Sequence, residues 1–221
     1  KETKFKDKNA QKWWIYKSLE NFRKTLISYN INLQIIKSEN YKKIFDEIAL
    51  KKNVSIYWNK IYEPDYLKFD DYLKKIFAEK NIEYKIFKGN ILSEFTETTK
   101  KDGSPFKVFT PFWRNAERIY QDKIPSLENN LKKCEKKILL FKHEIKENKI
   151  LSNNEWYKKF DKIWDPCEKS ALKQLNIFLK NSIENYSENR NFPNIIGTSK
   201  LSPYIKHGQI HVETIWKEAN N

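Results

Sequence analysis

The first part of the sequence alternates between helical and strand-like patterns, and this alternation constrains the fold more than any other feature. Apolar residues recur at helical spacing over 10–30, over 41–48 and after Pro64. Short apolar runs, which are candidate strands, occupy 31–36, 53–58 and 82–87. Strands that alternate with helices are typical of βαβ crossovers. The sequence therefore predicts an α/β domain with a Rossmann-like parallel sheet.

The pattern begins on a helix, whereas a parallel βαβ layout normally has a strand before its first helix. The chain also starts at Lys1 and contains no methionine. We therefore expect an internal piece of a longer protein, with the first strand preceding Lys1. The polar stretch 122–155 is weakly periodic and fits an interdomain linker.

The last part of the chain is predicted to be helical. Asp165 can cap a helix whose first turn contains Pro166 and Glu168. Ser202 and Pro203 begin a short helix that Gly208 can end. The predicted organisation is thus an α/β domain over 1–121, a linker over 122–155 and the beginning of a helical domain over 156–221.

Composition limits the possible partners and compartments. The net charge is +14, which favours a polyanionic partner such as nucleic acid. However, 39 of the 43 basic residues are lysines, and AT-rich codon usage would explain them equally well. Two cysteines exclude a disulfide scaffold and favour the reducing cytoplasm, and no apolar run is long enough to span a membrane.

The segment from Gly197 to Pro203 has the chemistry of a phosphate-binding loop. Gly197 permits a tight turn, and the side chains of Thr198, Ser199 and Ser202 supply hydroxyl groups. Free backbone N–H groups at the following helix start can bind an anion. A plain serine-capped helix is the simpler alternative on spacing alone.

Tyr186 and Arg190 lie four residues apart, so a helix would place them on one face. The arginine could bind a phosphate through two hydrogen bonds, and the tyrosine could contact a cofactor. An ordinary surface pair at a helix end is the alternative. His207 and His211 have a metal-ligand spacing, but Gly208 interrupts the helix that they would need, so no metal site is predicted.

Three segments, in order, resemble the DNA photolyase and cryptochrome family. YWNKIYEP at 57–64 is similar to the family's WNRRYEP stretch. GSPFKVFTPFWR at 103–114 is similar to its G.PFKVFTPFWR block. The third runs from Trp164 through RNFP at 190–193 to GTSKLSPY at 197–204. Lys200 stands where the family usually has arginine.

The resemblance implies an N-terminal antenna domain, a linker and a helical domain that binds FAD. It places FAD contacts at Tyr186, Thr198, Ser199, Leu201 and Ser202, with Lys200 in the same loop. It assigns Arg190 to a DNA phosphate and implies no acid, base or nucleophile in this segment. Most of the flavin domain would then follow Asn221.

The resemblance is strongest to bacterial photolyases that split cyclobutane pyrimidine dimers in UV-damaged DNA, acting as monomers by electron transfer from excited reduced flavin. A cryptochrome-like photoreceptor that binds FAD without repair is the alternative, and a separate basic binding domain is a third. A second chromophore is also implied. The folate-binding members have an Asn-Glu pair where this chain has Asp65 and Tyr66, so methenyltetrahydrofolate, a deazaflavin, another chromophore or none stay open.

Overall fold

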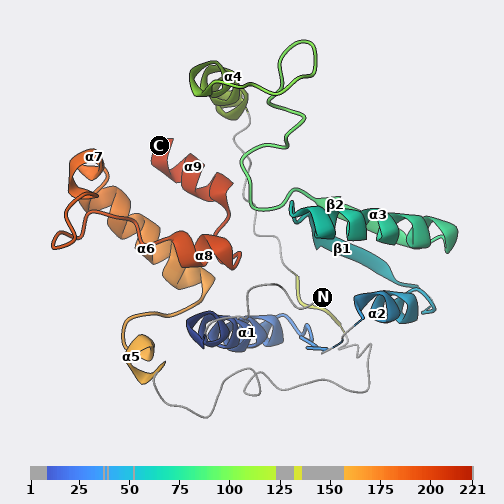
Figure 1. Cartoon of the computed structure of the whole chain (residues 1–221). Helices are drawn as coiled ribbons and strands as arrows, with labels where there is room; N and C mark the ends of the chain where they lie inside the picture. Colours follow the sequence, from blue (N-terminus) through green and yellow to red (C-terminus); the bar gives the residue numbers. More distant parts are fainter. Residues whose placement is uncertain are drawn as a thin grey trace. The chain divides into compact units, whose positions relative to one another are not determined.

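A computed structural model describes residues 9–36, 38, 40–51, 53–122, 132–135 and 157–220. The chain divides into two compact units, Lys1–Lys37 with Leu127–Asn221, and Ser38–Ser126. Figure 1 shows the helices and strands of both units. The first helix therefore belongs to the same unit as the helices at the end of the chain, whereas the predicted organisation assigned it to the first domain. The predicted domain boundaries at 121 and 155 stay a prediction. Within the described ranges, no helix has the length and hydropathy of a membrane span.

The unit Ser38–Ser126 is built on one βαβ crossover. Strands β1 (Ser55–Asn59) and β2 (Glu83–Phe87) pair in parallel, with Ser55 opposite Glu83 and Asn59 opposite Phe87. Helix α3 (Pro64–Glu79) connects them, as Figure 1 shows. Parallel strands need such a crossover because no tight turn can join them. The predicted parallel α/β fold is therefore confirmed.

The core of this unit lies between the strands and the two neighbouring helices, α2 (Tyr41–Ile48) and α3. Leu73 and Phe77 are buried on α3 and pack against alternate residues of the strands, Ile56, Trp58 and Tyr84. Both strands alternate between exposed and half-buried positions. Helix α4 (Phe109–Asp122) follows the two strands along the chain.

The predicted strand at 31–36 is wrong. In the structure these residues form no strand, and the described part of the chain offers them no neighbouring strand. A β-strand depends on backbone partners, so an apolar run without one does not form a ladder. One backbone carbonyl of this segment is bound by a side chain instead: Arg23 Nη1 donates to Leu33 O at 2.7 Å.

The other unit is helical. It contains α1 (Asn9–Ser28), α5 (Lys158–Asp161), α6 (Glu168–Asn181), α7 (Tyr186–Asn189), α8 (Ser202–Lys206) and α9 (Val212–Asn220). Its buried core residues are Trp13, Trp14, Ala171, Leu175, Leu201, Tyr204 and Ile210. Helix α1 thus shares a core with the helices after residue 157.

Three helices end in the same way, with a left-handed residue that closes the last turn. Gly208 has φ +71° after α8, and Asn30 and Asn81 have φ 59° and 52° after α1 and α3. After α3, Asn81 N donates to Ala78 O and Ile82 N donates to Phe77 O. These are the two bonds of a Schellman motif. The predicted role of Gly208 is therefore confirmed.

The predicted start of α6 is one detail that the structure corrects. Cys167, not Asp165, is the N-cap, and its sulfur accepts from Ser170 N at 3.4 Å. Asp165 supports the turn from outside the helix, because Ser170 Oγ donates to its Oδ2 at 2.6 Å. Hydrogen bonds donated to the Asp165 carboxylate, that of the Ser170 hydroxyl above all, lower its pKa.

Replacing Leu73 tests the crossover core. Leu73 is 2% exposed between α3 and the strands, so Leu73→Ala should lower the free energy of unfolding by about 2–5 kcal/mol. Leu50→Ala is a matched control, because Leu50 is 75% exposed and its truncation should change stability by at most ~0.5 kcal/mol. Denaturant titration measures both. Equal losses in the two variants would contradict this assignment of the core.

Candidate phosphate-binding site

The loop that leads into α8 starts from a glycine that touches the backbone of α7. A Cβ atom on Gly197 would lie 2.6 Å from the backbone C and O atoms of Asn189. Such a distance is shorter than atoms tolerate, so only glycine fits. Ser182 Oγ holds the preceding residue by donating to Ile196 O at 3.1 Å. The beginning of the loop is therefore fixed against α6 and α7.

In the middle of the loop, a left-handed residue is followed by a right-handed one. Lys200 has φ +52°, and Leu201, which follows it, is right-handed with φ −83° and ψ −15°. Successive residues of opposite handedness form a concave arrangement of N–H groups that binds anions. Among the described residues, no protein acceptor binds the N–H groups of Lys200 and Ser202. The turn thus has the donor geometry for a phosphate oxygen.

The hydroxyl groups of the loop are placed at its surface. Thr198 and Ser202 are exposed, and Ser199 is half-buried, where its Oγ accepts from Leu201 N at 3.4 Å. The N-cap of α8 is Leu201, with no side-chain cap bond. Ser202 is the first helical residue, so the simpler alternative of a serine-capped helix does not describe this start. Its hydroxyl is not used for capping.

Two buried residues anchor the loop in the core of the helical unit. Leu201 and Tyr204 are 2% and 4% exposed and pack in the core with Trp14. Tyr204 donates to Asp165 O at 3.3 Å, and burial raises the pKa of its hydroxyl. Trp14 Nε1 donates to Gln209 Oε1 at 3.0 Å, and Gln209 Nε2 donates to Ser18 Oγ at 2.7 Å. Helix α1 therefore braces both ends of α8.

Tyr186 and Arg190 lie together, as their spacing predicts. The Arg190 guanidinium is 5.2 Å from the centroid of the Tyr186 ring, and Arg190 N donates to Tyr186 O at 3.1 Å. Phe178 also contacts the Tyr186 ring, in an edge-to-face arrangement with ring centroids 5.6 Å apart. Stacking orders the guanidinium while its N–H groups stay available in its plane. Such an arginine is suited to a phosphate ligand.

The predicted site residues thus fall into two neighbouring groups of the sequence, the loop 197–203 and the Tyr186–Arg190 stack. The contact of Gly197 with Asn189 connects the two. Sequence reasoning missed the supporting residues Trp14, Ser18 and Gln209, because they are far apart in the chain. Whether these groups bind a cofactor or DNA stays a prediction at this point.

A second polar cluster lies where both strands end. Tyr62 donates to Glu94 Oε1 at 2.8 Å and accepts from Gly89 N at 3.2 Å, and Lys60 Nζ lies 3.1 Å from Glu94 Oε2. Burial, and then the bond to Glu94, raise the pKa of Tyr62 to about 12. Ser93 shares a hydrogen bond with Tyr120 of α4 at 3.1 Å. Hydrogen bonds between side chains therefore connect the loops that follow the two strands.

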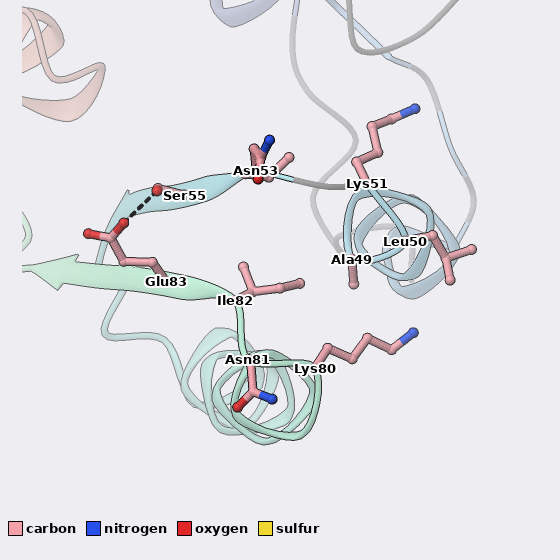
Figure 2. A pocket seen from close by; sticks show the side chains of 10 residues that line it. Ala49, Leu50, Lys51, Asn53, Ser55, Lys80, Asn81, Ile82 and Glu83 are labelled. Carbon is pink, nitrogen blue, oxygen red and sulfur yellow. Dashed lines mark hydrogen bonds between the residues drawn. The ribbon is translucent and has the colours of Figure 1, made fainter.

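A pocket lies at the opposite, amino edge of the strands, and Figure 2 shows its lining. Lys51 and Lys80 come from the ends of α2 and α3, and Ser55 donates to Glu83 at 2.6 Å. None of the predicted site residues lines it. In the described part of the chain, no three histidine, cysteine or acidic side chains are grouped as a metal site.

Comparison with known proteins connects these features to one family. The family model described as DNA photolyase matches residues 1–129. A deoxyribodipyrimidine photo-lyase of Agrobacterium fabrum is 28% identical over 208 residues, which are 94% of this chain and 43% of that protein. Cryptochrome-2 of Arabidopsis thaliana is 25% identical over 232 residues, covering 98% of this chain and 36% of that protein.

A solved structure of the same family is also similar to this chain. The crystal structure of a bacterial class III photolyase from Agrobacterium tumefaciens matches with a TM-score of 0.74 and 28% identity, covering 95% of this chain and 43% of that one. The chain therefore spans less than half the length of each of these relatives.

Tyr62→Phe tests the carboxyl-edge cluster through its pH dependence. The pKa is about 12 in the folded state and about 10 for an ordinary tyrosine. Folding therefore holds the proton more tightly, and the stabilising contribution is complete below about pH 10 and is lost as the pH rises through about 12. Removal of the hydroxyl should cost about 1–2 kcal/mol at neutral pH.

The measurement is the free energy of unfolding of both proteins from neutral pH upward. The difference between them should stay constant to about pH 10 and then shrink. Tyr66→Phe, outside the cluster, controls for the loss of a tyrosine hydroxyl. A difference that does not change above about pH 10 would show that Tyr62 does not stabilise the fold as a proton donor.

Proposed function

The chain belongs to the DNA photolyase family, and from this premise we propose that the protein repairs DNA by light-driven splitting of cyclobutane pyrimidine dimers. The observation that supports repair is the similarity to a deoxyribodipyrimidine photo-lyase along 94% of the chain. In the same proposal, residues 1–121 belong to the antenna domain, 122–155 to the linker and 156–221 to the flavin domain.

The proposed cofactor is FAD, and the loop at 197–203 is proposed to hold its pyrophosphate. The fit rests on the donors of this loop, which are the N–H groups of Lys200 and Ser202 and the exposed hydroxyls of Thr198 and Ser202. Ser199, Leu201 and Tyr186 complete the proposed contacts. Light-driven electron donation to the dimer is the chemistry that a bound flavin supplies. The residues of this chain bind and orient, and none needs to transfer a proton.

Arg190 is proposed to bind a phosphate of the damaged strand. Its guanidinium is exposed and is ordered by the Tyr186 ring at 5.2 Å. A preorganised guanidinium loses less side-chain entropy on binding than a free lysine does. The proposed DNA contact and the proposed cofactor loop are therefore built on adjoining turns.

A blue-light photoreceptor that binds FAD without repair is the second candidate, because cryptochrome-2 is similar along 98% of the chain. The antenna chromophore is a separate question. Asp65 lies in the first turn of α3, and Tyr66, 38% exposed, follows it. Neither reproduces an Asn-Glu pair, so we propose a deazaflavin or another chromophore ahead of methenyltetrahydrofolate.

A repair assay separates the two candidates. The complete protein, with its flavin reduced, is mixed with DNA that contains thymine dimers and is kept in blue light or in the dark. We expect loss of dimers in the light alone, measured by chromatography of the digested DNA. Flavin-loaded protein that binds the DNA but leaves the dimers intact in the light would favour the photoreceptor.

A double substitution tests the cofactor loop. Thr198→Ala with Ser202→Ala removes two hydroxyls, and each bond to a charged group is worth about 1.5–3 kcal/mol. We therefore expect flavin affinity to fall by at least about tenfold, since ~1.4 kcal/mol is a factor of ten. Flavin absorbance per protein after dialysis measures retention. Ser187→Ala, an exposed serine of α7, is the matched control, and equal retention in all three proteins would refute the assignment.

A further inference from the structure

Three residues form a closed ring of hydrogen bonds between α1 and the turn after α8. Trp14 Nε1 donates to Gln209 Oε1 at 3.0 Å, Gln209 Nε2 donates to Ser18 Oγ at 2.7 Å, and Ser18 Oγ donates to Trp14 O at 2.7 Å. Gln209 lies 195 and 191 positions from its two partners along the chain. The three residues are therefore a tertiary constraint, and we call Trp14, Ser18 and Gln209 the hydrogen-bond ring.

The direction of each bond in the ring follows from Trp14. An indole nitrogen can only donate, so it meets the amide oxygen of Gln209 and leaves the amide nitrogen facing Ser18. Ser18 accepts that bond and donates its own proton to the backbone one turn earlier in α1. Position 209 thus needs a side chain that accepts at one atom and donates at the other. Glutamine does both, whereas an ionised glutamate only accepts and a leucine does neither.

The backbone of Gln209 closes the last turn of α8. Gln209 N donates to Tyr204 O at 2.9 Å, and Gly208 N donates to Ile205 O at 3.1 Å. With His207 as the C-cap, these are the two bonds of a Schellman motif. The side chain of Gln209 therefore binds α1 while its backbone binds the end of α8.

Helix α8 is too short for its two ends to be independent. It has five residues, and helices of this length are not stable by themselves in water. Ile205 N donates to Leu201 O at 2.9 Å, and His207 N donates to Pro203 O at 3.1 Å. Little more than one turn thus separates the end of α8 from the loop 197–203. A constraint on the end of α8 is consequently also a constraint on this loop.

We propose that Gln209 is a positioning residue for the loop 197–203, because its side-chain amide fixes α8 against α1. This inference rests on the proposed function, in which the N–H groups of Lys200 and Ser202 bind the pyrophosphate of FAD. Gln209 acts through α8 and needs no contact with the cofactor. A loop that is held in place before its ligand arrives loses less conformational entropy on binding. Loosening the hydrogen-bond ring should therefore weaken flavin binding although every donor of the loop is kept.

The test uses the complete protein with the substitution Gln209→Leu, which roughly keeps the size of the side chain and removes both of its bonds. The dissociation constant for FAD, measured by titration of flavin fluorescence, should rise about fivefold, which corresponds to the ~1 kcal/mol of one net hydrogen bond. In the flavin-free protein, amide hydrogen exchange should become faster at Ile205 and His207, whose N–H groups bind carbonyls of the loop.

Asn21→Ala is the matched control. Asn21 Nδ2 donates to Asp165 Oδ1 at 3.1 Å and to Pro166 O at 3.3 Å, so this substitution also removes two bonds between α1 and the later part of the chain. It should lower the free energy of unfolding without changing FAD affinity or exchange in α8. Ser18→Ala removes a partner of the Gln209 amide and should have a smaller effect than Gln209→Leu, and it carries the test if Gln209→Leu does not fold.

Flavin affinity and amide exchange of the Gln209→Leu protein that both equal those of the wild type would overturn the positioning role. An equal loss of FAD affinity in Asn21→Ala would also overturn it, since the effect would then follow from general destabilisation.

Failure of the proposed function has a different signature. If the loop does not bind FAD, Gln209→Leu should accelerate exchange at Ile205 and His207 without changing flavin affinity, and the Thr198→Ala, Ser202→Ala variant should also keep its flavin. That result would overturn the cofactor loop and, with it, the role of Gln209 in binding. Loss of flavin in the double variant, with unchanged affinity and exchange in Gln209→Leu, would leave the cofactor loop intact and remove the positioning role alone.

Discussion

The adjacent tryptophans of α1 are the contact on which the candidate site depends. Trp13 is completely buried and Trp14 is 6% exposed, although they are consecutive and point to different parts of the core. Trp14 meets Tyr204 at 5.0 Å and Trp164 at 5.5 Å, and its indole nitrogen binds Gln209. The loop at 197–203 can be exposed and yet ordered because this buried cluster holds the residues on either side of α8. Burial of large aromatic surfaces therefore supplies the rigidity that a phosphate site needs.

The sheet-containing unit obtains its order from a different constraint. Two parallel strands bury little surface by themselves and need α3 over one face. At the carboxyl edge of the strands, the backbone of Gly89 lies so close to that of Lys60 that a Cβ on Gly89 would collide with Lys60 O. Tyr62 and Glu94 then bind across the loops that follow the two strands. Edge loops of parallel sheets often receive ligands, whereas in this chain their polar groups satisfy one another.

Local patterns predicted the elements that depend on local physics. Helical spacing located α1 and the start of α3, and capping residues located the start of α6, to within a few residues. Gly208 was correctly predicted to end α8, because a left-handed residue is a backbone requirement there. The strand at 31–36 failed because strand formation depends on a partner that no local pattern reveals. Likewise, the Trp14–Gln209 bond joins residues 195 positions apart, and no spacing rule could have found it.

The net charge and the surroundings of Arg190 bear differently on the proposed binding of DNA. The charge of +14 is carried by lysines spread along the chain, and a dispersed charge attracts any polyanion without selecting a binding site. Arg190 differs because its guanidinium lies 5.2 Å from the centroid of the Tyr186 ring, and because the loop proposed to bind phosphate touches Asn189, the residue before it. The long-range field of the lysines would accelerate encounter, and it weakens with salt. A bond from Arg190 to a phosphate would act at short range, so in the proposed function it would fix where the DNA lies, and it would itself weaken with salt.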